Sequence, residues 1–375
     1  MIFLKLSTVL VLHRLVIFNH NYMLRDKFFS RNILKFRKMS HTMPVAEPIY
    51  VDELPKYGEI FRLKDDYIEG EPLKLILKVE EHLTETLWWP SKNNDENVIL
   101  FMITGNPGVI DYYVEFLNTV HDELGKKIDI VGVSMLGHSH GPHNPSLKNL
   151  YSLQDQINHK IHCIDKLKSR FTSHEKQPKF IICGHSIGAY IGSQVLKART
   201  NHGIEMVYAL YPTLQHIVKT PNGTMMNFLF NERPRSLAAS SVMYLRYFIP
   251  PTFLKFLVAN LTWQKESMVD ITLSALLYGH VVENALYMAS NEMETVCELD
   301  EEFYREHLDK FIFYFSECDK WAPLEHYEDM KRRFPEGKVL LCEKNTPHAF
   351  VLSHGDVIGK NVAGWIVGKM TRDLN

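Results

Sequence analysis

The sequence predicts an α/β fold with a mostly parallel central sheet, helices on both of its faces and an inserted helical cap. Short apolar runs typical of buried strands alternate with longer amphipathic runs typical of helices across residues 50–212 and 304–375. This alternation favours a parallel sheet, because parallel neighbours need a helix-length crossover between them. Residues 213–303 lose the alternation and are too long for a loop, which predicts the cap.

The predicted core elements follow one another along the chain. Strands are expected at Glu59–Lys64, Leu73–Val79, Asn97–Thr104, Ile128–Ser134, Phe180–Cys183, Glu205–Tyr211, Lys310–Phe315 and Lys338–Cys342. Helices are expected at Asp111–Leu124, Leu153–Ser169, Ile187–Arg199 and Asp356–Met370. The later strands and helices, 304–375, would complete the sheet that 50–212 begins.

Residues 1–45 form a basic N-terminal extension that is predicted to lie outside the fold. Eight Lys or Arg residues precede Met39, against a single acid, Asp26. Charged residues interrupt the apolar runs, so neither a secretory signal nor a membrane span is predicted. The composition fits a mitochondrial presequence or a membrane-adhering arm, and translation starting at Met39 or Met43 would leave the extension out.

The composition of the whole chain narrows its class and its partners. The net charge of −2 argues against nucleic-acid binding, and 45% apolar with 23% charged residues is ordinary for a globular protein. The five cysteines are odd in number, scattered and without a C-x-x-C pair. Reduced thiols in a cytosol-facing protein are therefore expected, and no motif calls for a cofactor.

The most informative motif is Gly184-His185-Ser186-Ile187-Gly188. A β-branched apolar run precedes it and an amphipathic run follows it without a break. This is the pattern of a nucleophile elbow, in which a strained turn presents a serine between a strand and a helix. The turn requires small residues two positions on either side of Ser186, and both are glycine. We therefore predict Ser186 as a catalytic nucleophile.

A second G-x-S-x-G match, Gly137 to Gly141, places Ser139 after another apolar run. Pro142 and Pro145 follow at once, and proline there would prevent a regular helix. We therefore expect Ser139 in a loop and favour Ser186.

A serine nucleophile needs a base, and the base needs an acid to orient it. In α/β-hydrolases the acid and then the base follow the serine along the chain, each after a strand. Asp319 comes after the predicted strand 310–315, and His348 comes after 338–342. We favour Asp319 over Glu317, which is close enough to its strand to remain in the pleat, and His348 over the more distant His354.

The oxyanion formed in such a reaction needs two backbone donors. One is expected from Ile187, directly after the nucleophile, and the other from the turn Gly105-Asn106-Pro107-Gly108. Because proline has no N–H, Asn106 is the first choice and Gly108 the second.

The loop His138-Ser139-His140-Gly141-Pro142-His143 resembles the histidine motif of metallo-hydrolases. Pro142 stands where the accompanying acid is required, and the loop holds no carboxylate. We therefore predict no catalytic metal and a polar loop at the rim of the serine site.

One segment of the predicted cap, Met243–Leu261, is rich in aromatic and aliphatic residues. Arg246 and Lys255 leave it too short to span a bilayer, and the Pro250-Pro251 pair breaks any helix at its centre. Two helices meeting at this corner would suit monotopic burial at a lipid surface or cover an apolar substrate pocket. The predicted lipid-surface residues are Phe248, Ile249, Pro250, Pro251, Phe253 and Leu254.

Four motifs together resemble the lipid droplet-associated hydrolase family: Gly105-Asn-Pro-Gly108, Gly184-His-Ser-Ile-Gly188, Asp319-Lys-Trp-Ala-Pro323 and Pro347-His-Ala-Phe-Val351. The resemblance runs from about Pro55 to the last helix and leaves the N-terminal extension unmatched. It implies an α/β-hydrolase fold on cytosol-facing surfaces of lipid droplets and the endoplasmic reticulum, acting on neutral lipid esters such as sterol esters. It also implies that Ser186, Asp319 and His348 are the nucleophile, acid and base.

Two functions remain open from the sequence. The first is a serine hydrolase that cleaves a lipid ester through an acyl-serine intermediate. The second is a surface scaffold in lipid storage with weak or vestigial activity. The complete set of catalytic residue types favours the first.

Overall fold

The computed structural model describes residues 49–373, except 141–148, 175 and 263. The predicted N-terminal extension and three residues of the histidine-containing loop, Gly141, Pro142 and His143, lie outside the described residues.

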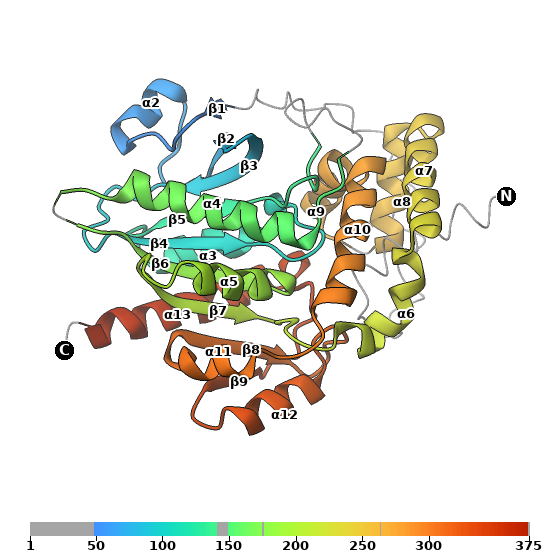
Figure 1. Cartoon of the computed structure of the whole chain (residues 1–375). Helices are drawn as coiled ribbons and strands as arrows, with labels where there is room; N and C mark the ends of the chain where they lie inside the picture. Colours follow the sequence, from blue (N-terminus) through green and yellow to red (C-terminus); the bar gives the residue numbers. More distant parts are fainter. Residues whose placement is uncertain (1–48, 141–148, 175, 263, 374–375) are drawn as a thin grey trace.

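A nine-stranded sheet forms the centre of the described chain (Figure 1). Its strands are β1 (Ile49–Val51), β2 (Leu73–Val79), β3 (His82–Trp89), β4 (Val98–Ile103), β5 (Asp129–Val133), β6 (Lys179–His185), β7 (Ile204–Leu210), β8 (Phe311–Ser316) and β9 (Lys338–Cys342). Their spatial order is β1-β2-β3-β5-β4-β6-β7-β8-β9. β3 runs antiparallel to both of its neighbours, and every other pair is parallel. The predicted fold class, the α/β-hydrolase type with a mostly parallel sheet, is confirmed.

Helices connect these strands and cover both faces of the sheet. The longer ones are α3 (Val114–Glu123), α4 (Leu153–Phe171), α5 (Ile187–Ala198), α6 (Pro221–Phe230), α7 (Glu232–Phe248), α8 (Pro251–Thr262), α9 (Glu266–Ile271), α10 (Gly279–Thr295), α11 (Glu301–Glu306), α12 (Leu324–Arg333) and α13 (Gly355–Asp373). Shorter helical turns are η2 (Tyr57–Glu59), α2 (Ile60–Leu63), η3 (Ile110–Tyr113), η4 (Ile217–Lys219), the π-helical η5 (Thr272–Leu276), η6 (Leu308–Lys310) and η7 (Phe350–Leu352).

The alternation of side chains along each strand separates two apolar cores. In β4, Ile99, Phe101 and Ile103 contribute to a core shared with α4 and α5. Val98, Leu100 and Met102 belong to the core beneath α3 and α13 on the other face. Because successive strand residues point to opposite faces, one apolar strand serves both cores, as expected for a covered parallel sheet.

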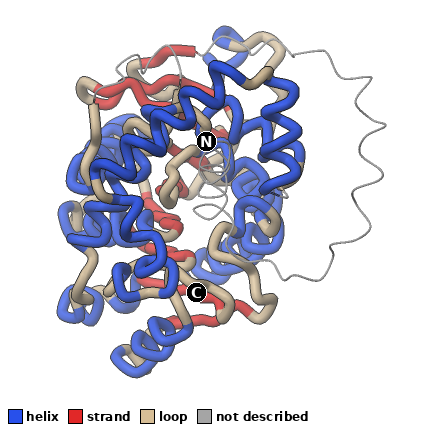
Figure 2. The backbone as a smooth tube through the Cα atoms, turned by 90° about the vertical axis from the view of Figure 1, so that its right-hand side faces the viewer, coloured by secondary structure: helices blue, strands red, loops and turns tan. Residues whose placement is uncertain are grey.

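The chain between β7 and β8 is helical, and we call α6 to α10 the cap helices. They gather at one end of the sheet, at the right of Figure 1, and Figure 2 views the molecule from their side. α10 packs along α7 and also contacts α4 and α6. This end of the sheet is where β4 and β6 finish, and α10 contacts the turn that follows β4.

The prediction for the first strand was wrong. Residues 57–63 form the helical turns η2 and α2, where a strand was expected. The backbone N–H of Lys56 donates to Glu59 Oε2 at 2.8 Å, which supports the helical start. A run of six residues is too short to separate a strand pattern from a helical one. β1 and β3 were not predicted, whereas the later strands and helices lie where the sequence placed them, to within three residues at their ends.

None of the helices within the described part of the chain combines the length and apolarity needed to cross a bilayer.

Candidate active site

Ser186 occupies the turn between β6 and α5 in strained backbone geometry, with φ of 55° and ψ of −124°. The two glycines around it are sterically required. A Cβ on Gly184 would lie 2.4 Å from the carbonyl oxygen of Gly188, and a Cβ on Gly188 would lie 2.3 Å from that of Ile103. Because real Cβ atoms do not approach backbone oxygens so closely, the turn forms only with glycine at both positions.

Three predicted site residues meet in one hydrogen-bonded chain. The Ser186 hydroxyl donates to Nε2 of His348 across 2.8 Å. Nδ1 of the same ring donates to Oδ2 of Asp319 across 2.6 Å. These residues come from the turns after β6, β8 and β9, whose carboxyl ends share one edge of the sheet. The arrangement can move the serine proton to His348 while Asp319 holds the ring in the required tautomer.

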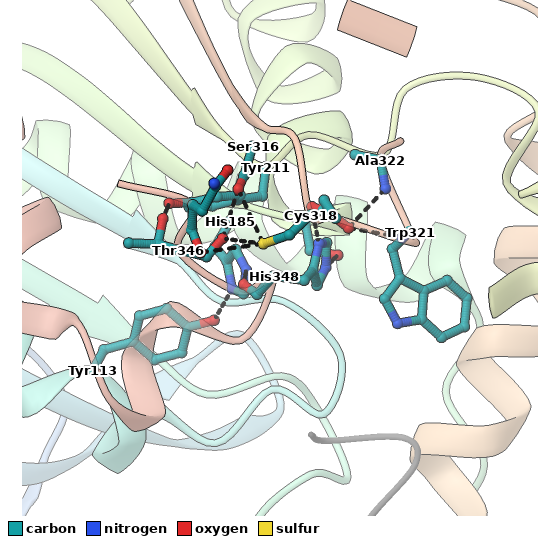
Figure 3. A network of polar contacts seen from close by, with 12 residues as sticks. Tyr113, His185, Tyr211, Ser316, Cys318, Trp321, Ala322, Thr346 and His348 are labelled. Atoms are coloured by element: carbon teal, nitrogen blue, oxygen red, sulfur yellow. Dashed lines mark hydrogen bonds and ion pairs between the residues drawn. The ribbon is translucent and has the colours of Figure 1, made fainter. Parts of the chain in front are cut away.

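The backbone that follows Asp319 holds its carboxylate in place. Oδ1 accepts hydrogen bonds from the N–H of Trp321 at 2.7 Å and of Ala322 at 3.0 Å (Figure 3). The Asp319 side chain is 0% exposed. With one oxygen bound by the backbone, the other faces His348 only, which fixes the orientation of the imidazole.

His185 joins the elbow to the loop that carries His348. Its Nε2 donates to the backbone carbonyl of His348 at 2.9 Å, and its Nδ1 accepts from the hydroxyl of Tyr113 at 2.7 Å (Figure 3). Tyr113 in turn accepts from the N–H of Gly105 at 2.8 Å. Burial, with His348 nearby, holds the pKa of His185 well below its ordinary value, so the ring is neutral. These hydrogen bonds of His185 were not predicted from the sequence.

A second network of polar contacts holds the loop that carries His348 (Figure 3). Thr346 contacts Tyr211 and Cys342 through its hydroxyl group. Its carbonyl accepts a hydrogen bond from Ser316 Oγ at 2.7 Å and contacts Cys318 Sγ at 3.2 Å. The strands β8 and β9 therefore hold this loop two residues before His348.

The turn after β4 lies against the elbow. A Cβ on Gly105 would stand 3.2 Å from Cβ of Ser186. The N–H of Ile187, at the first position of α5, has no acceptor within its own helix and is oriented as a helix N-terminal donor. The N–H of Gly108 donates to Nδ1 of His138 at 2.8 Å, so this second predicted donor is already bonded within the protein.

The competing residues lie apart from this hydrogen-bonded chain. Ser139 is buried in the loop after β5, and Glu317 is exposed to solvent. His354 stands at the start of α13, where Nδ1 contacts the hydroxyl of its neighbour Ser353 at 2.7 Å.

The described histidines of the predicted rim loop have separate partners. Burial lowers the pKa of His138 to about 3, and its Nδ1 accepts from the backbone. The His140 ring stacks on Tyr278, with ring centroids 3.5 Å apart. Among the residues that the structure describes, no group of three or more His, Cys, Asp or Glu side chains is placed to hold a metal ion.

Several exposed apolar side chains lie on the cap helices. Phe248 is 67% exposed, Phe253 is 48% exposed, and the prolines between them are exposed as well. Tyr244 and Tyr247 of α7 add to this surface, although they were absent from the predicted set.

Leu254 is only 4% exposed, so its predicted place at the lipid surface is wrong. The helical repeat of α8 puts Leu254, Val258 and Thr262 on its inner face. Ile249 is half-buried and packs against the core. Arg246 donates to the carbonyl of Leu273, and Lys255 pairs with Asp270 at 2.6 Å, so both cations have partners within the protein.

Comparison with known proteins decides the family. The sequence model described as lipid-droplet associated hydrolase matches residues 96–351. The chain belongs to the lipid droplet-associated hydrolase family. The human lipid droplet-associated hydrolase is 30% identical over 304 residues, covering 76% of this chain and 90% of that protein. The mouse relative of the same name is 30% identical, with 73% and 86% covered, and the Dictyostelium discoideum one is 27% identical, with 82% and 96% covered.

Solved structures of this fold include other hydrolases. A bacterial membrane phospholipase A matches with a TM-score of 0.54 and 11% identity, covering 80% of this chain and 87% of that one. A putative lipase from Acinetobacter baumannii matches with a TM-score of 0.51 and 14% identity, covering 88% and 100%. At this identity the likeness concerns the fold alone. Fold and family together identify the chain as a hydrolase.

Proposed function

We propose that this family member is a serine hydrolase that cleaves a lipid ester, such as a sterol ester, through an acyl-Ser186 intermediate. The observation that carries the proposal is the unbroken hydrogen-bonded chain from Ser186 through His348 to the buried Asp319. The names of the relatives support a lipid as the substrate.

The reaction proceeds in two halves. Ser186 Oγ attacks the ester carbonyl while its proton passes to Nε2 of His348, and the N–H groups of Ile187 and Asn106 stabilise the oxyanion. His348 then gives that proton to the departing alcohol, which leaves an acyl ester on Ser186. Water, deprotonated by His348, attacks this ester and releases the fatty acid, and the proton returns to Ser186.

The protein acts at a cytosol-facing lipid droplet or endoplasmic reticulum surface, to which the cap helices attach it. An apolar patch of exposed aromatic side chains on helices favours burial at a lipid–water interface. Tyr247 and Phe248, exposed by 82% and 67%, contribute most to this surface. With Arg246 and Lys255 paired internally, attachment depends on apolar burial more than on contacts with phosphates.

The alternative is a scaffold at the same surface with weak or vestigial activity. Labelling with a fluorophosphonate probe, which reacts with an activated serine, separates the two. The wild-type protein and Ser139→Ala should be labelled, and Ser186→Ala should not. Neutral lipid esters in emulsion should then be hydrolysed by the wild type and left intact by Ser186→Ala. A wild-type protein that is folded but neither labelled nor active would favour the scaffold.

A further inference from the structure

The cap helix α10 presents polar groups to the hydrolase core at a spacing of seven residues. Asn284 and Asn291 form one pair through their side chains, and the next pair consists of the backbone carbonyl of Ala285 and the side chain of Glu292. Seven residues are close to two helical turns, so the members of each pair lie on one side of the helix. α10 is therefore well placed to hold two separate points of the core.

The first pair holds the chain at the start of α4. Oδ1 of Asn284 accepts from the N–H of Tyr151 at 3.0 Å. Oδ1 of Asn291 accepts from the N–H of Leu153 at 3.2 Å. These contacts dock the cap helix on the core without touching the hydrogen-bonded chain around Ser186.

The second pair holds the turn that follows β4. Nδ2 of Asn106 donates to Oε1 of Glu292 at 2.8 Å and to the carbonyl oxygen of Ala285 at 2.9 Å. A side-chain amide has two protons, and both are used here. The side chain of Asn106 therefore has no proton left for a substrate, and the backbone N–H remains as its donor.

Glu292 is an unusual partner for this amide because it is 7% exposed. Burial raises the pKa of Glu292 to about 8, although the hydrogen bond from Asn106 acts in the opposite direction. The carboxyl group is therefore neutral at neutral pH and accepts the bond without the cost of a buried charge.

We propose that Glu292 is a positioning residue for the oxyanion donor. It accepts a hydrogen bond from the side chain of Asn106 and so holds this residue with its backbone N–H facing the carbonyl oxygen of the ester bound at Ser186. The amide and the backbone N–H belong to one residue, so fixing the side chain at two points restricts rotation of the peptide group beside it. The cap thereby completes the oxyanion site from a segment 186 residues further along the chain. This inference rests on the proposed serine hydrolase function.

The test compares steady-state ester hydrolysis and fluorophosphonate labelling rates for the full chain and its variants. Glu292→Ala should lower kcat and the labelling rate by about 10- to 100-fold, somewhat less than the loss of a whole oxyanion donor. KM should change much less, because the donor is needed mainly when negative charge develops. Glu292→Gln should restore most of kcat, since its amide oxygen can accept the same bond.

Asn291→Ala is the matched control, because it truncates the adjacent residue of α10 and loses only the bond to Leu153. It should keep the wild-type kcat. Asn106→Ala keeps its backbone N–H but loses the side-chain hydrogen bonds to α10, so its kcat should fall as in Glu292→Ala. The double variant of Asn106 and Glu292 should be no slower than either single one.

Wild-type kcat in folded Glu292→Ala or in Asn106→Ala would overturn the inference while leaving the hydrolase function intact. An equal loss in Asn291→Ala would also overturn it, because docking of α10 alone would then account for the effect. Additive losses in the double variant would do the same. If Glu292→Ala does not fold, Asn106→Ala and Glu292→Gln decide the matter. If the wild-type protein is neither labelled nor active, the proposed function is contradicted, and this inference is contradicted with it.

Discussion

Nε2 of His185 lies 2.9 Å from the backbone carbonyl oxygen of His348, so the residue before the elbow serine anchors the loop that presents the imidazole to that serine. The side chains of Tyr211 and Phe350 pack edge-on against the ring of His185. Because the ring is buried and neutral, each of its nitrogens needs a partner of the right kind, and both have one.

Replacing His185 with phenylalanine should therefore impair both stability and catalysis. The ring packing is kept, but the hydroxyl of Tyr113 and the carbonyl of His348 lose their partner. We expect the free energy of unfolding to fall by about 1–3 kcal/mol, the usual cost of buried unsatisfied groups. Displacement of His348 should reduce kcat by roughly tenfold or more. Chemical denaturation and ester kinetics measure the two effects.

Tyr113→Phe is the control for this variant, because it removes one hydroxyl and leaves the bond between His185 and His348 in place. Its kcat should stay closer to that of the wild type. Equal kcat values for His185→Phe and the wild type would show that the anchor does not position the base.

Alanine variants of Asp319 and His348 should each lose about a thousandfold or more of kcat. The double variant should lose little more than the worse single one, because the residues act as a unit on one proton. Glu317→Ala and His354→Ala, which alter the competing acid and base, should remain active. The same kinetic assay applies to all five variants. If Glu317→Ala is inactive while Asp319→Ala stays active, or His354→Ala is inactive while His348→Ala stays active, the assignment of the acid or the base is reversed.

Serine substitution of Tyr244, Tyr247, Phe248 and Phe253 should release the protein from lipid surfaces. These side chains are exposed, so the fold should tolerate the change, while the apolar area withheld from the lipid removes about 25 cal/mol of binding free energy per Å². Flotation with phospholipid-coated neutral lipid droplets measures the bound fraction.

Serine at Phe61 and Ile68, which are exposed residues far from the cap in the sequence, provides the matched control and should leave binding intact. Ser186→Ala should also still bind, because attachment needs no catalysis. A folded quadruple variant that floats like the wild type would place the attachment elsewhere.

Glu292→Gln should increase stability at alkaline pH. The pKa of Glu292 is about 8 in the folded protein, against about 4.3 for an unfolded glutamate. Between these values the folded state holds a proton that the unfolded state has lost. The stabilisation from that proton is complete below pH 4.3 and is lost as the pH rises through 8, by up to about 1.4 kcal/mol per pH unit.

Glutamine does not titrate, so the Tm of Glu292→Gln minus that of the wild type should increase from pH 5 to pH 9. Thermal unfolding at pH 5, 7 and 9 measures this difference. A difference that stays constant across the three pH values would contradict the buried, neutral state of Glu292.

The fold and the meeting of Ser186, Asp319 and His348 were predictable because their signals are local. Each of Ser186, Asp319 and His348 follows an apolar run, and parallel strands place such positions along one edge. The helical turn at residues 57–63 and the strand β3 were missed because their residues give no clear period. β3 includes the buried Glu85, and a charge within a strand weakens the apolar pattern that prediction depends on.

The sequence by itself determined the elbow and the order of the strands and helices from β4 onwards, because glycine spacing and apolar period act over a few residues. Only the tertiary structure decided that Glu292 holds Asn106, that His185 anchors His348 and that Leu254 faces inwards. The first two contacts join segments more than 160 residues apart, and the burial of Leu254 depends on which side of α8 meets the rest of the protein. A short-range sequence pattern does not predict these contacts or this orientation, because they depend on how complete elements pack against one another.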